Sequence, residues 1–229
     1  GVVTVISSLE QQNDPYAVSR KRMIQEQLVA RGISDPRVLD IMNRVPRHVF
    51  VDDALKNQAY IDAPLSIGEG QTISQPYIVA LMTQALALNG TEKVLEIGTG
   101  CGYQTVILSL AAKKVYTIER IKTLGIEARG RFKKFGLKNI VMRVGDGSVG
   151  WAEAQPFDRV LVSCASPQIP VSLVAQLVVG GQLVVPVSLS MGHQNLLRIT
   201  RTSTSYQTED LGACHFVRLV GRFGYQSET

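Results

Sequence analysis

A glycine repeat that directly follows a short apolar run constrains the fold of this sequence most strongly. Residues 93–97 are typical of a buried strand, Glu96-x-Gly98-x-Gly100-x-Gly102 closes it, and residues 103–112 have the apolar spacing of a helix. Glycine permits positive φ angles and lets a ligand approach the backbone closely. In open α/β sheets this strand–turn–helix arrangement binds nucleotides. The loop therefore predicts a nucleotide-type site on a Rossmann-like sheet.

The spacing of the glycines and the acid before them select among nucleotide ligands. A dinucleotide-binding turn counted from Gly98 needs its third glycine at position 103, where the sequence has Tyr103. Glu96 places a carboxylate at the strand end, where a cation is favoured and a pyrophosphate is not. The sulfonium and amino groups of S-adenosylmethionine carry such positive charge. We therefore expect S-adenosyl-L-methionine as the cofactor and S-adenosyl-L-homocysteine as its product.

Two further acids follow the next predicted strands. Glu119 comes after the strand 114–118, about 20 residues beyond Glu96, a spacing at which an acid meets ribose hydroxyls. Asp146 stands between two glycines after the strand 140–144 and suits the adenine amino group. Each acid alone also fits an ordinary turn. Their occurrence after successive strands favours one shared site, because ligands bind at the carboxyl ends of such strands.

The remaining chain alternates between helical and strand-like segments, the pattern of a parallel sheet covered on both faces. We predict an α/β fold: a Rossmann-like, doubly wound, mostly parallel sheet of the class I S-adenosylmethionine methyltransferase type, with an N-terminal helical and loop-rich cap. Residues 1–75 would form the cap, packed on the same domain, and residues 76–229 the cofactor-binding domain. The other predicted helices are 14–33, 34–45, 76–88, 121–135 and 171–178, and the other strands are 159–164 and 182–187, with strand-like alternation over 195–219.

Pro and Gly residues determine two of these predictions, the loops of residues 46–75 and the end of the helix 171–178. Residues 46–75 are rich in Pro, Gly and isolated polar groups, so we expect loops with too little periodicity to be core elements. The helix 171–178 is expected to end at Gly180-Gly181.

Composition and charge give weaker constraints. A chain of 229 residues, 45% of them hydrophobic, is long enough to bury a full core. The formal net charge is +5, but Lys and Arg are spread along the chain without a long basic run. The densest cluster, within residues 129–138, alternates with apolar residues at helical spacing, which favours a solvated helix face over a nucleic-acid patch.

The three cysteines, Cys101, Cys164 and Cys214, have neither the even number of a disulfide framework nor the paired spacing of a zinc site. The opening GVVTVISSLE is too short for a membrane span and has no basic region before it. We therefore expect a cytoplasmic protein with no metal, no membrane association and no nucleic-acid partner.

Several longer segments match a known family. They are Pro46-Arg47-His48-Val49-Phe50, Gly68-Glu69-Gly70-Gln71-Thr72-Ile73-Ser74-Gln75-Pro76, residues 96–104, residues 115–120, Gly145-Asp146-Gly147 and Phe216-Val217-Arg218-Leu219-Val220. In these segments the chain, from about residue 14 to residue 220, resembles the bacterial type of the protein-L-isoaspartate (D-aspartate) O-methyltransferases. The Thr-Ile-Ser-x-Pro segment is the discriminating one, since many methyltransferases share the glycine loop. Cys101 stands where relatives often have serine, and Ser163-Cys164-Ala165 replaces a more usual small-residue run.

The resemblance implies methyl transfer to the free carboxylate of L-isoaspartyl and D-aspartyl residues in age-damaged proteins and peptides. The ester then closes to a succinimide, whose hydrolysis regenerates normal aspartate in part, so that repeated cycles amount to repair. A carboxylate is already ionised at neutral pH, so no general base is required. Ser74 is expected to orient the substrate by a hydrogen bond. It also fits an N-cap of the helix that begins at Pro76, and both roles remain open.

The loop motif and the resemblance together give the expected site. Ser74 is the expected catalytic residue. The expected cofactor contacts are Ile73, Ser74, Glu96, Gly98, Thr99, Gly100, Gly102, Gln104, Glu119, Arg120, Asp146 and Gly147. The expected substrate contacts are Thr72, Ser74, His48 and Phe216, although His48 also fits a packed histidine.

Three other functions remain as alternatives. A methyltransferase acting on RNA or a small molecule would share the cofactor loop and suit the basic charge. A nicotinamide-dependent oxidoreductase is disfavoured by Tyr103 and by the lack of a Tyr-x-x-x-Lys pair. A catalytically idle sensor is disfavoured by the presence of Ser74 together with the full set of loop residues.

Overall fold

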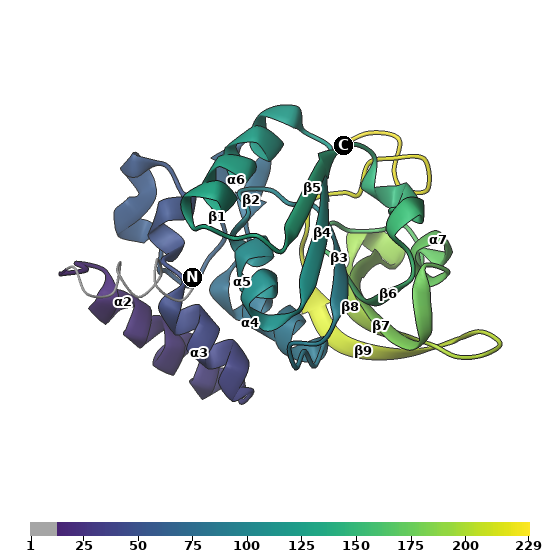
Figure 1. Ribbon diagram of the computed structural model, residues 1–229, viewed down its shortest axis with the longest axis horizontal. Coiled ribbons are helices and arrows are strands. Elements are labelled where there is room, and N and C mark those ends of the chain that lie inside the picture. Colours follow the sequence, from purple (N-terminus) through teal and green to yellow (C-terminus); the bar gives the residue numbers. More distant parts are fainter. Residues whose placement is uncertain (1–12) are drawn as a thin grey trace.

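The computed structural model describes residues 13–229, which are built around a seven-stranded sheet (Figure 1). The strand order is β5-β4-β3-β6-β7-β8-β9, parallel from β5 to β7, with β8 and β9 added antiparallel. The predicted Rossmann-like, mostly parallel α/β fold is thereby confirmed. The strands are Lys93–Ile97 (β3), Lys114–Glu119 (β4), Ile140–Val144 (β5), Phe157–Val162 (β6), Leu177–Ser188 (β7), Gln194–Arg201 (β8) and Tyr206–Cys214 (β9).

The strand order reverses at β3. β4 and β5 lie on one side of it, and β6 and β7 lie on the other. Ile97, the last residue of β3, pairs with Ile118 of β4 and Val162 of β6. In open α/β sheets, ligands bind outside the carboxyl ends of the strands at such a switch point. The glycine loop follows Ile97 and therefore lies where a ligand is expected.

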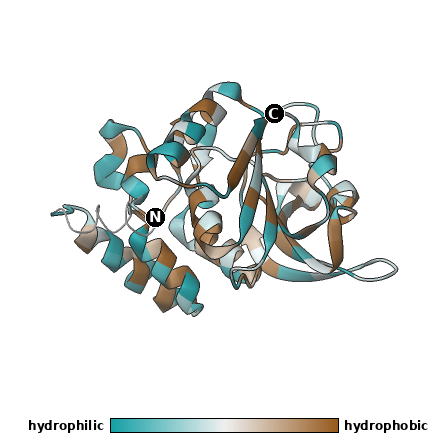
Figure 2. Ribbon diagram, viewed as in Figure 1, coloured by the Kyte–Doolittle hydropathy of each residue, from teal (hydrophilic) through white to brown (hydrophobic). Residues whose placement is uncertain are grey.

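Helices cover the two faces of the sheet unequally. α4 (Pro76–Ala85), α5 (Tyr103–Ala111) and α6 (Lys122–Lys134) lie on one side, and the short α7 (Val171–Val174) lies on the other (Figure 1). Side chains of β3 alternate between two apolar clusters, with Val94 in the cluster that includes α4 and α5 residues, and Leu95 and Ile97 in the cluster around α7. Figure 2 shows apolar residues along the strands and mixed residues on the helices.

The N-terminal part is a cap of short elements. Asp35 caps α3, because its Oδ1 accepts a hydrogen bond from Arg37 N at 2.9 Å and Pro36 occupies the first helical position. The elements of the cap are Ala17–Arg22 (α2), a π-helical stretch Met23–Leu28 (η1), Val29–Arg31 (η2), Pro36–Arg44 (α3), Arg47–Phe50 (η3), Asp53–Gln58 (η4), Leu65–Gly68 (β1) and Gln71–Ile73 (β2).

The prediction of one continuous helix over residues 14–33 is wrong at the start of the helix and in its interior. The helix begins at Ala17, because Asp14 Oδ1 accepts a hydrogen bond from Tyr16 N in a preceding turn. It then widens into the π-helical stretch, whose i→i+5 spacing places Met23 and Leu28 on one buried face. A left-handed glycine, Gly32, ends it.

The expectation that residues 46–75 hold no core elements is also wrong. Phe50, Ala59 and Tyr60 are buried, and the buried Leu65 and Ile73 pair with one another at the open end of a small antiparallel hairpin. These apolar residues come singly or as a neighbouring pair, on 3-10 helices, a turn and short strands, and therefore produce no helical or strand period in the sequence. Burial here is decided by tertiary packing.

The helix expected over residues 171–178 is much shorter than predicted. α7 ends at Val174, and β7 begins at Leu177 and continues through Gly180-Gly181. β7 pairs with β6 at Phe157↔Leu177 and again at Arg159↔Gln182, so the glycines form an irregularity within one strand. They mark a bulge, which glycine in a strand often indicates.

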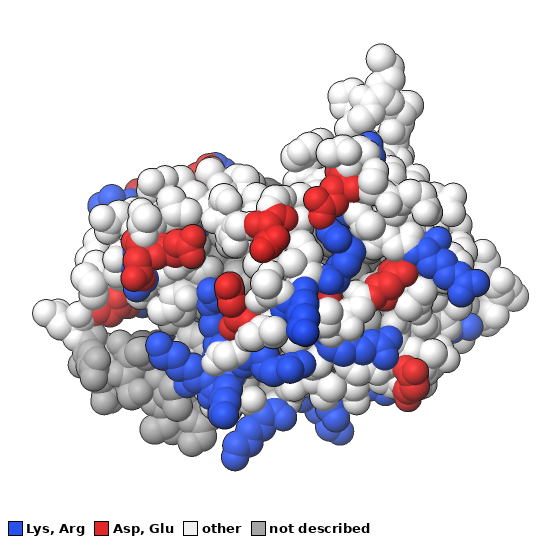
Figure 3. All heavy atoms as spheres, turned by 90° about the horizontal axis from the view of Figure 1, so that it is seen from above, with Lys and Arg blue, Asp and Glu red and all other residues white. Residues whose placement is uncertain are grey.

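The surface carries both signs of charge. The basic cluster on α6 lies on a solvated face as expected, since Arg129 and Lys133 are exposed while Ala128 and Phe132 are buried. Figure 3 shows Lys and Arg gathered in a band on the face seen from above, with Asp and Glu beside them. Within residues 13–229, none of the helices has the length and apolar character needed to cross a membrane. The opening GVVTVISSLE lies outside the described residues.

Candidate active site

A cavity of about 570 Å³ lies at the carboxyl ends of β3 and β4. Three stretches of chain form its wall: β2 with the start of α4, the glycine loop with the end of β4, and the segment that follows β9. The wall comprises residues 71–75, 97–101, 118–121 and 213–220, with Pro64, Tyr77, Ile78, Val79, Leu81, Met82, Tyr103, Gln104, Gly147, Ser163, Cys164 and Leu211. The predicted nucleotide site and the predicted Ser74 segment therefore share one cavity.

Ser74 lies between β2 and α4, half-buried in the cavity wall. The N-cap of α4 is Gln75, and no side chain caps the helix. Gln75 instead donates from Nε2 to Asp62 Oδ1 at 2.7 Å. The alternative interpretation of Ser74 as an N-cap is therefore wrong. Its hydroxyl is available to a ligand in the cavity.

Hydrogen bonds to β4 hold the start of the glycine loop where it leaves β3. Gly98 N donates to Ile118 O at 2.9 Å, and Gly98 and Gly100 line the cavity with positive φ angles of 94° and 55°. Gly102 was expected to contact the cofactor but lies outside the wall. A Cβ atom there would stand 2.7 Å from Phe132 Cε1, so this glycine allows the loop to pack on α6.

Glu119 ends β4 with its carboxylate at the cavity. Its Oε1 accepts a hydrogen bond from Gly100 N at 2.8 Å, and its Oε2 accepts one from Ile121 N at 2.8 Å. Two backbone amides thus fix the orientation of the carboxylate, and each oxygen keeps lone pairs for further donors. Vicinal ribose hydroxyls are donors of the kind that this geometry accepts.

Glu96 lies behind the wall, contrary to the expectation of a direct cofactor contact. Strand alternation turns its side chain to the α5 face, away from that of Ile97. Its Oε1 accepts from Thr117 Oγ1 at 2.7 Å and from Thr105 Oγ1, while Oε2 has no partner among the described residues. Burial raises the pKa of this carboxyl to about 7.

Thr117 connects this buried acid to the loop. The hydroxyl that donates to Glu96 also bonds to Thr99 Oγ1 at 2.6 Å, and Thr99 lines the cavity. Glu96 therefore acts on the cavity through Thr117 and Thr99.

Gly147 lines the cavity, whereas the neighbouring Asp146 does not. Asp146 is turned towards the C-terminal segment, where its Oδ2 accepts a hydrogen bond from Arg222 N at 2.8 Å. Its expected contact with the adenine amino group stays a prediction, because a carboxylate oxygen that accepts one hydrogen bond keeps a lone pair for another donor. A Cβ at position 147 would lie 2.4 Å from Ile97 Cγ2, so only glycine fits there.

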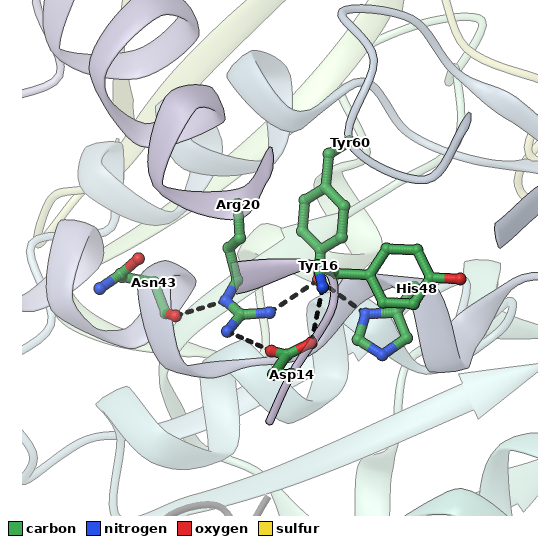
Figure 4. Close-up of polar contacts among 6 residues, drawn as sticks. All are labelled: Asp14, Tyr16, Arg20, Asn43, His48 and Tyr60. Atoms are coloured by element: carbon green, nitrogen blue, oxygen red, sulfur yellow. Dashed lines mark hydrogen bonds and ion pairs between the residues drawn. The ribbon is translucent and has the colours of Figure 1, made fainter. Parts of the chain in front are cut away.

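His48 also lies outside the cavity, within a polar cluster of the cap (Figure 4). Its ring stacks on Tyr16 with centroids 4.1 Å apart, and Nδ1 lies 2.9 Å from Tyr60 Oη. Arg20 donates to the same tyrosine oxygen at 3.1 Å and forms an ion pair with Asp14. Burial lowers the pKa of His48. The packed-histidine alternative is the one that the geometry supports, and a substrate contact is not.

Four other expected residues do line the cavity. Thr72 is exposed at its mouth, and Phe216 is buried in its far wall. Gln104 donates from Nε2 to Thr83 Oγ1 at 2.9 Å, which fixes the amide. Arg120 forms an exposed ion pair with Glu228 near the C-terminus.

The sequence analysis identified Phe216 but missed the contribution of β9 and of the residue that directly follows it. Leu211 and Ala213 line the cavity from β9, an antiparallel edge strand that carries no motif, and His215 lines it directly after the strand. The segment is held in place by Gln194, whose Oε1 accepts from Phe216 N at 2.7 Å. No local pattern predicts this contribution, because β9 and the glycine loop are brought to the same cavity only by tertiary structure.

All three cysteines of the chain line the cavity. Burial raises the pKa of Cys164 to about 12 and that of Cys214 to about 11, and it also raises the pKa of Cys101. The thiols are therefore protonated at neutral pH. A protonated thiol is a poor nucleophile, which suits a wall that faces an electrophilic cofactor.

The cavity fits S-adenosylmethionine in size, and its wall fits the cofactor in chemistry. Its volume is within the range of small-molecule sites, roughly 300–1,000 Å³. Bare backbone at Gly98 and Gly100 permits close approach, Glu119 offers an oriented carboxylate, and apolar side chains such as Ile118 and Val220 suit a purine.

Comparisons with known proteins agree with this geometry. The family model of protein-L-isoaspartate (D-aspartate) O-methyltransferase matches residues 18–224. The chain is 49% identical over 214 residues to the protein-L-isoaspartate O-methyltransferase of Geobacter metallireducens, covering 93% of this chain and 99% of that one. It is 51% identical over 212 residues to the enzyme of the same name from Trichlorobacter lovleyi, covering 92% and 97%.

Solved structures give the same result. One protein-L-isoaspartate O-methyltransferase superposes with a TM-score of 0.82 at 25% identity, covering 90% of this chain and 67% of the other. A Plasmodium falciparum chain assigned to the same class, in complex with S-adenosyl-L-homocysteine, gives a TM-score of 0.77 at 25% identity, covering 88% and 98%. With the family model matched over nearly its whole described length, this chain belongs to the protein-L-isoaspartate (D-aspartate) O-methyltransferase family.

Proposed function

We propose that this chain transfers a methyl group from S-adenosylmethionine to the free carboxylate of L-isoaspartyl and D-aspartyl residues in damaged proteins and peptides, which initiates repair through a succinimide. Membership of the family supports the reaction. One observation in the structure carries the proposal. The Ser74 hydroxyl does not cap α4, and Ser74 lies in the same cavity wall as the glycine loop and Glu119. A serine hydroxyl beside the cofactor loop is what a carboxylate acceptor requires.

The protein needs to position the acceptor carboxylate and exclude water from the cavity, and it does not need to provide acid–base catalysis. S-adenosylmethionine supplies a methyl group that its sulfonium already activates. Ser74 donates a hydrogen bond to one carboxylate oxygen of the substrate and leaves the other oxygen directed at the methyl carbon. The apolar wall excludes water. Such positioning can lower a barrier by roughly 7–11 kcal/mol when the geometry is good.

The cofactor roles follow from the wall. Glu119 accepts hydrogen bonds from the ribose hydroxyls, since its orientation is fixed by two backbone amides. Gly98 and Gly100 form the floor under the amino-acid portion, and Gly147 approaches the adenine. Ile73, Thr99, Gln104 and Arg120 complete this part of the cavity.

The substrate side lies between two extended segments. Thr72 of β2 and Phe216, which follows β9, both line the cavity. Extended segments present backbone groups, so we propose that the enzyme reads the main chain around the altered residue. Damage arises at many sequences, and main-chain recognition accommodates them. The three unpaired cysteines support a reducing, cytoplasmic location.

A label-transfer assay tests the proposal. The enzyme receives S-adenosylmethionine tritiated in the methyl group, with an isoaspartyl peptide or its normal aspartyl twin. Base-labile label on the isoaspartyl peptide alone is the expected result.

The basic band in Figure 3 gives RNA methylation as the second candidate, and an RNA arm tests it. Label on RNA with none on the isoaspartyl peptide, or equal label on both peptides, would contradict the proposal.

A further inference from the structure

The carboxylate of Asp62 fixes the side chain of Gln75, the residue that directly follows Ser74. Gln75 Nε2 donates to Asp62 Oδ1 at 2.7 Å, and Arg31 Nη1 donates to the same oxygen at 2.9 Å. The second carboxylate oxygen accepts a hydrogen bond from Arg31 Nη2. The Arg31 guanidinium also lies over the ring of Tyr77, with Cζ 5.5 Å from the ring centroid. Two residues of the cap thus set the orientation of a side chain beside Ser74.

The ion pair between Arg31 and Asp62 contributes little to the stability of the fold. The two side chains are 40% and 38% exposed, and water screens the attraction between exposed charges. The hydrogen bonds from Arg31 lower the pKa of Asp62, so its carboxylate is charged at neutral pH. A charged acceptor holds the amide of Gln75 more firmly than a neutral one would. The main consequence of the ion pair is therefore a fixed Gln75 amide.

Gln75 is held at its main chain as well as at its side chain. Its carbonyl oxygen accepts hydrogen bonds from two main-chain amides of the first turn of α4, at 3.1 and 3.2 Å. Because Nε2 donates to a carboxylate, the side-chain amide is not free to flip, and Oε1 has no hydrogen-bond donor among residues 13–229. Gln75 is half-buried and lines the cavity. A preset hydrogen-bond acceptor therefore lies next to Ser74.

We propose that Gln75 is a substrate-binding residue, whose Oε1 accepts a hydrogen bond from a main-chain N–H within one residue of the damaged one, and that Asp62 and Arg31 are positioning residues for this contact. The proposal rests on the proposed function for the identity of the substrate. Ser74 and Gln75 are consecutive, with Cα atoms about 3.8 Å apart, so one holds the carboxylate while the other holds the main chain beside it. Nearly every sequence offers such an N–H, which suits damage at many sites.

N-methylated peptides test the contact. Three isoaspartyl peptides each carry one N-methyl group, on the isoaspartyl residue, on the residue before it or on the residue after it. Methyl transfer gives kcat/KM for each peptide and for the unmodified parent. With the wild type, at least one N-methylated peptide should lose roughly three- to tenfold in kcat/KM, the effect of one hydrogen bond.

Gln75→Ala should lose a similar factor in kcat/KM with the parent peptide. It should lose no further factor with the N-methylated peptide that the wild type discriminates against, because the two changes remove the same hydrogen bond. Its affinity for S-adenosyl-L-homocysteine, measured by calorimetry, should equal that of the wild type. Gln75→Met provides the same comparison if the alanine variant does not fold.

Asp62→Ala tests the positioning role. It should raise KM for the parent peptide without changing the affinity for S-adenosyl-L-homocysteine, and it should have no effect when residue 75 is already alanine. Asp40→Ala is the matched control, because it removes another exposed ion pair of the cap, with Arg44, and neither residue lines the cavity. The kinetic constants of this control should equal those of the wild type.

Three results would overturn the proposal. They are an unchanged kcat/KM in Gln75→Ala, losses that add to those of Gln75→Ala with all three N-methylated peptides, and an effect of Asp62→Ala that persists when residue 75 is alanine. A wild-type chain that methylates neither the parent nor any N-methylated isoaspartyl peptide would instead contradict the proposed function.

Discussion

At the scale of single residues, Ser74 and Glu119 divide the work of the site. Ser74 lies on the side of the cavity formed by β2 and α4, with a hydroxyl that the helix does not use. Glu119 lies at the end of β4, with both carboxylate oxygens already oriented by backbone amides. The first is placed to act on the acceptor and the second on the cofactor, so their substitutions should have different kinetic signatures.

Ser74→Ala should lower kcat roughly 10- to 100-fold and change the affinity for S-adenosyl-L-homocysteine little, because it removes one hydrogen bond to a charged acceptor group. Steady-state kinetics with an isoaspartyl peptide and calorimetry provide the two measurements. Ser66→Ala on the adjacent strand is the control, since Ser66 is exposed and lies outside the wall. A loss of cofactor affinity with normal kcat would contradict the assignment.

Glu119→Ala should weaken S-adenosyl-L-homocysteine roughly tenfold or more, because both the ribose contact and the bond to Gly100 N are lost. Calorimetry measures this directly. Glu127→Ala on the exposed face of α6 should bind as the wild type does. If saturating cofactor failed to restore most of the kcat of Glu119→Ala, Glu119 would have a role beyond binding.

At the scale of elements, the sequence predicted what local patterns encode. The glycine loop, β3, α5 and α6 follow from glycine spacing and apolar periodicity, and so does the presence of Glu119 at the cavity. The face of the sheet towards which a side chain points is harder to predict from the sequence. Glu96 was assigned to the cofactor because it ends a strand beside the loop, yet alternation turns it to the α5 face. His48 similarly lies away from the cavity, against partners distant in sequence such as Tyr60, and Asp146 accepts a hydrogen bond from Arg222 N of the C-terminal segment.

The contact between β3, β4 and α5 through Glu96 has a pH-dependent cost. Burial raises its pKa from the ordinary 4.5 to about 7, so the folded state favours the protonated acid. The stabilisation that the protonated Glu96 carboxyl gives the folded state is fully present below pH 4.5, and it is lost as the pH rises through about 7. The difference corresponds to roughly 3 kcal/mol.

Glu96→Gln should remove this pH dependence, because glutamine keeps an acceptor for Thr105 and Thr117 without titrating. Denaturant titrations between pH 4 and pH 8 would show the variant gaining stability relative to the wild type as the pH rises. A constant difference across that range would contradict the prediction, because it would show that the pKa of Glu96 is the same in the folded and the unfolded protein.

At the scale of the whole molecule, the cap and the sheet share one core. The apolar cluster that contains Met23 and Phe50 of the cap also contains Val106 of α5 and Phe135 after α6. Phe50 stacks on Phe135 with ring centroids 5.7 Å apart and meets Tyr103 edge-on at 5.3 Å. We therefore propose that the described part of the cap, residues 13–75, folds together with residues 76–229 and not as a separate unit.

Phe50→Ala should destabilise the entire fold by roughly 3–5 kcal/mol, the cost of deleting a large buried side chain. The far-UV circular dichroism and the fluorescence of Trp151, which packs against the opposite apolar cluster, should then shift to lower denaturant concentration together. Val18→Ala, at a side chain that is 71% exposed, should change stability by less than about 0.5 kcal/mol. An early loss of helical signal with an unshifted Trp151 transition would show that the cap unfolds alone.

The central claim is that this cavity converts isoaspartyl residues towards normal aspartate. The most direct measurement follows an isoaspartyl peptide by chromatography during incubation with the enzyme and excess S-adenosylmethionine. The isoaspartyl form should decline while the succinimide appears transiently and the normal aspartyl peptide accumulates, with more S-adenosylhomocysteine formed than peptide repaired. An isoaspartyl peptide that persists unchanged while the enzyme methylates another acceptor would contradict the account.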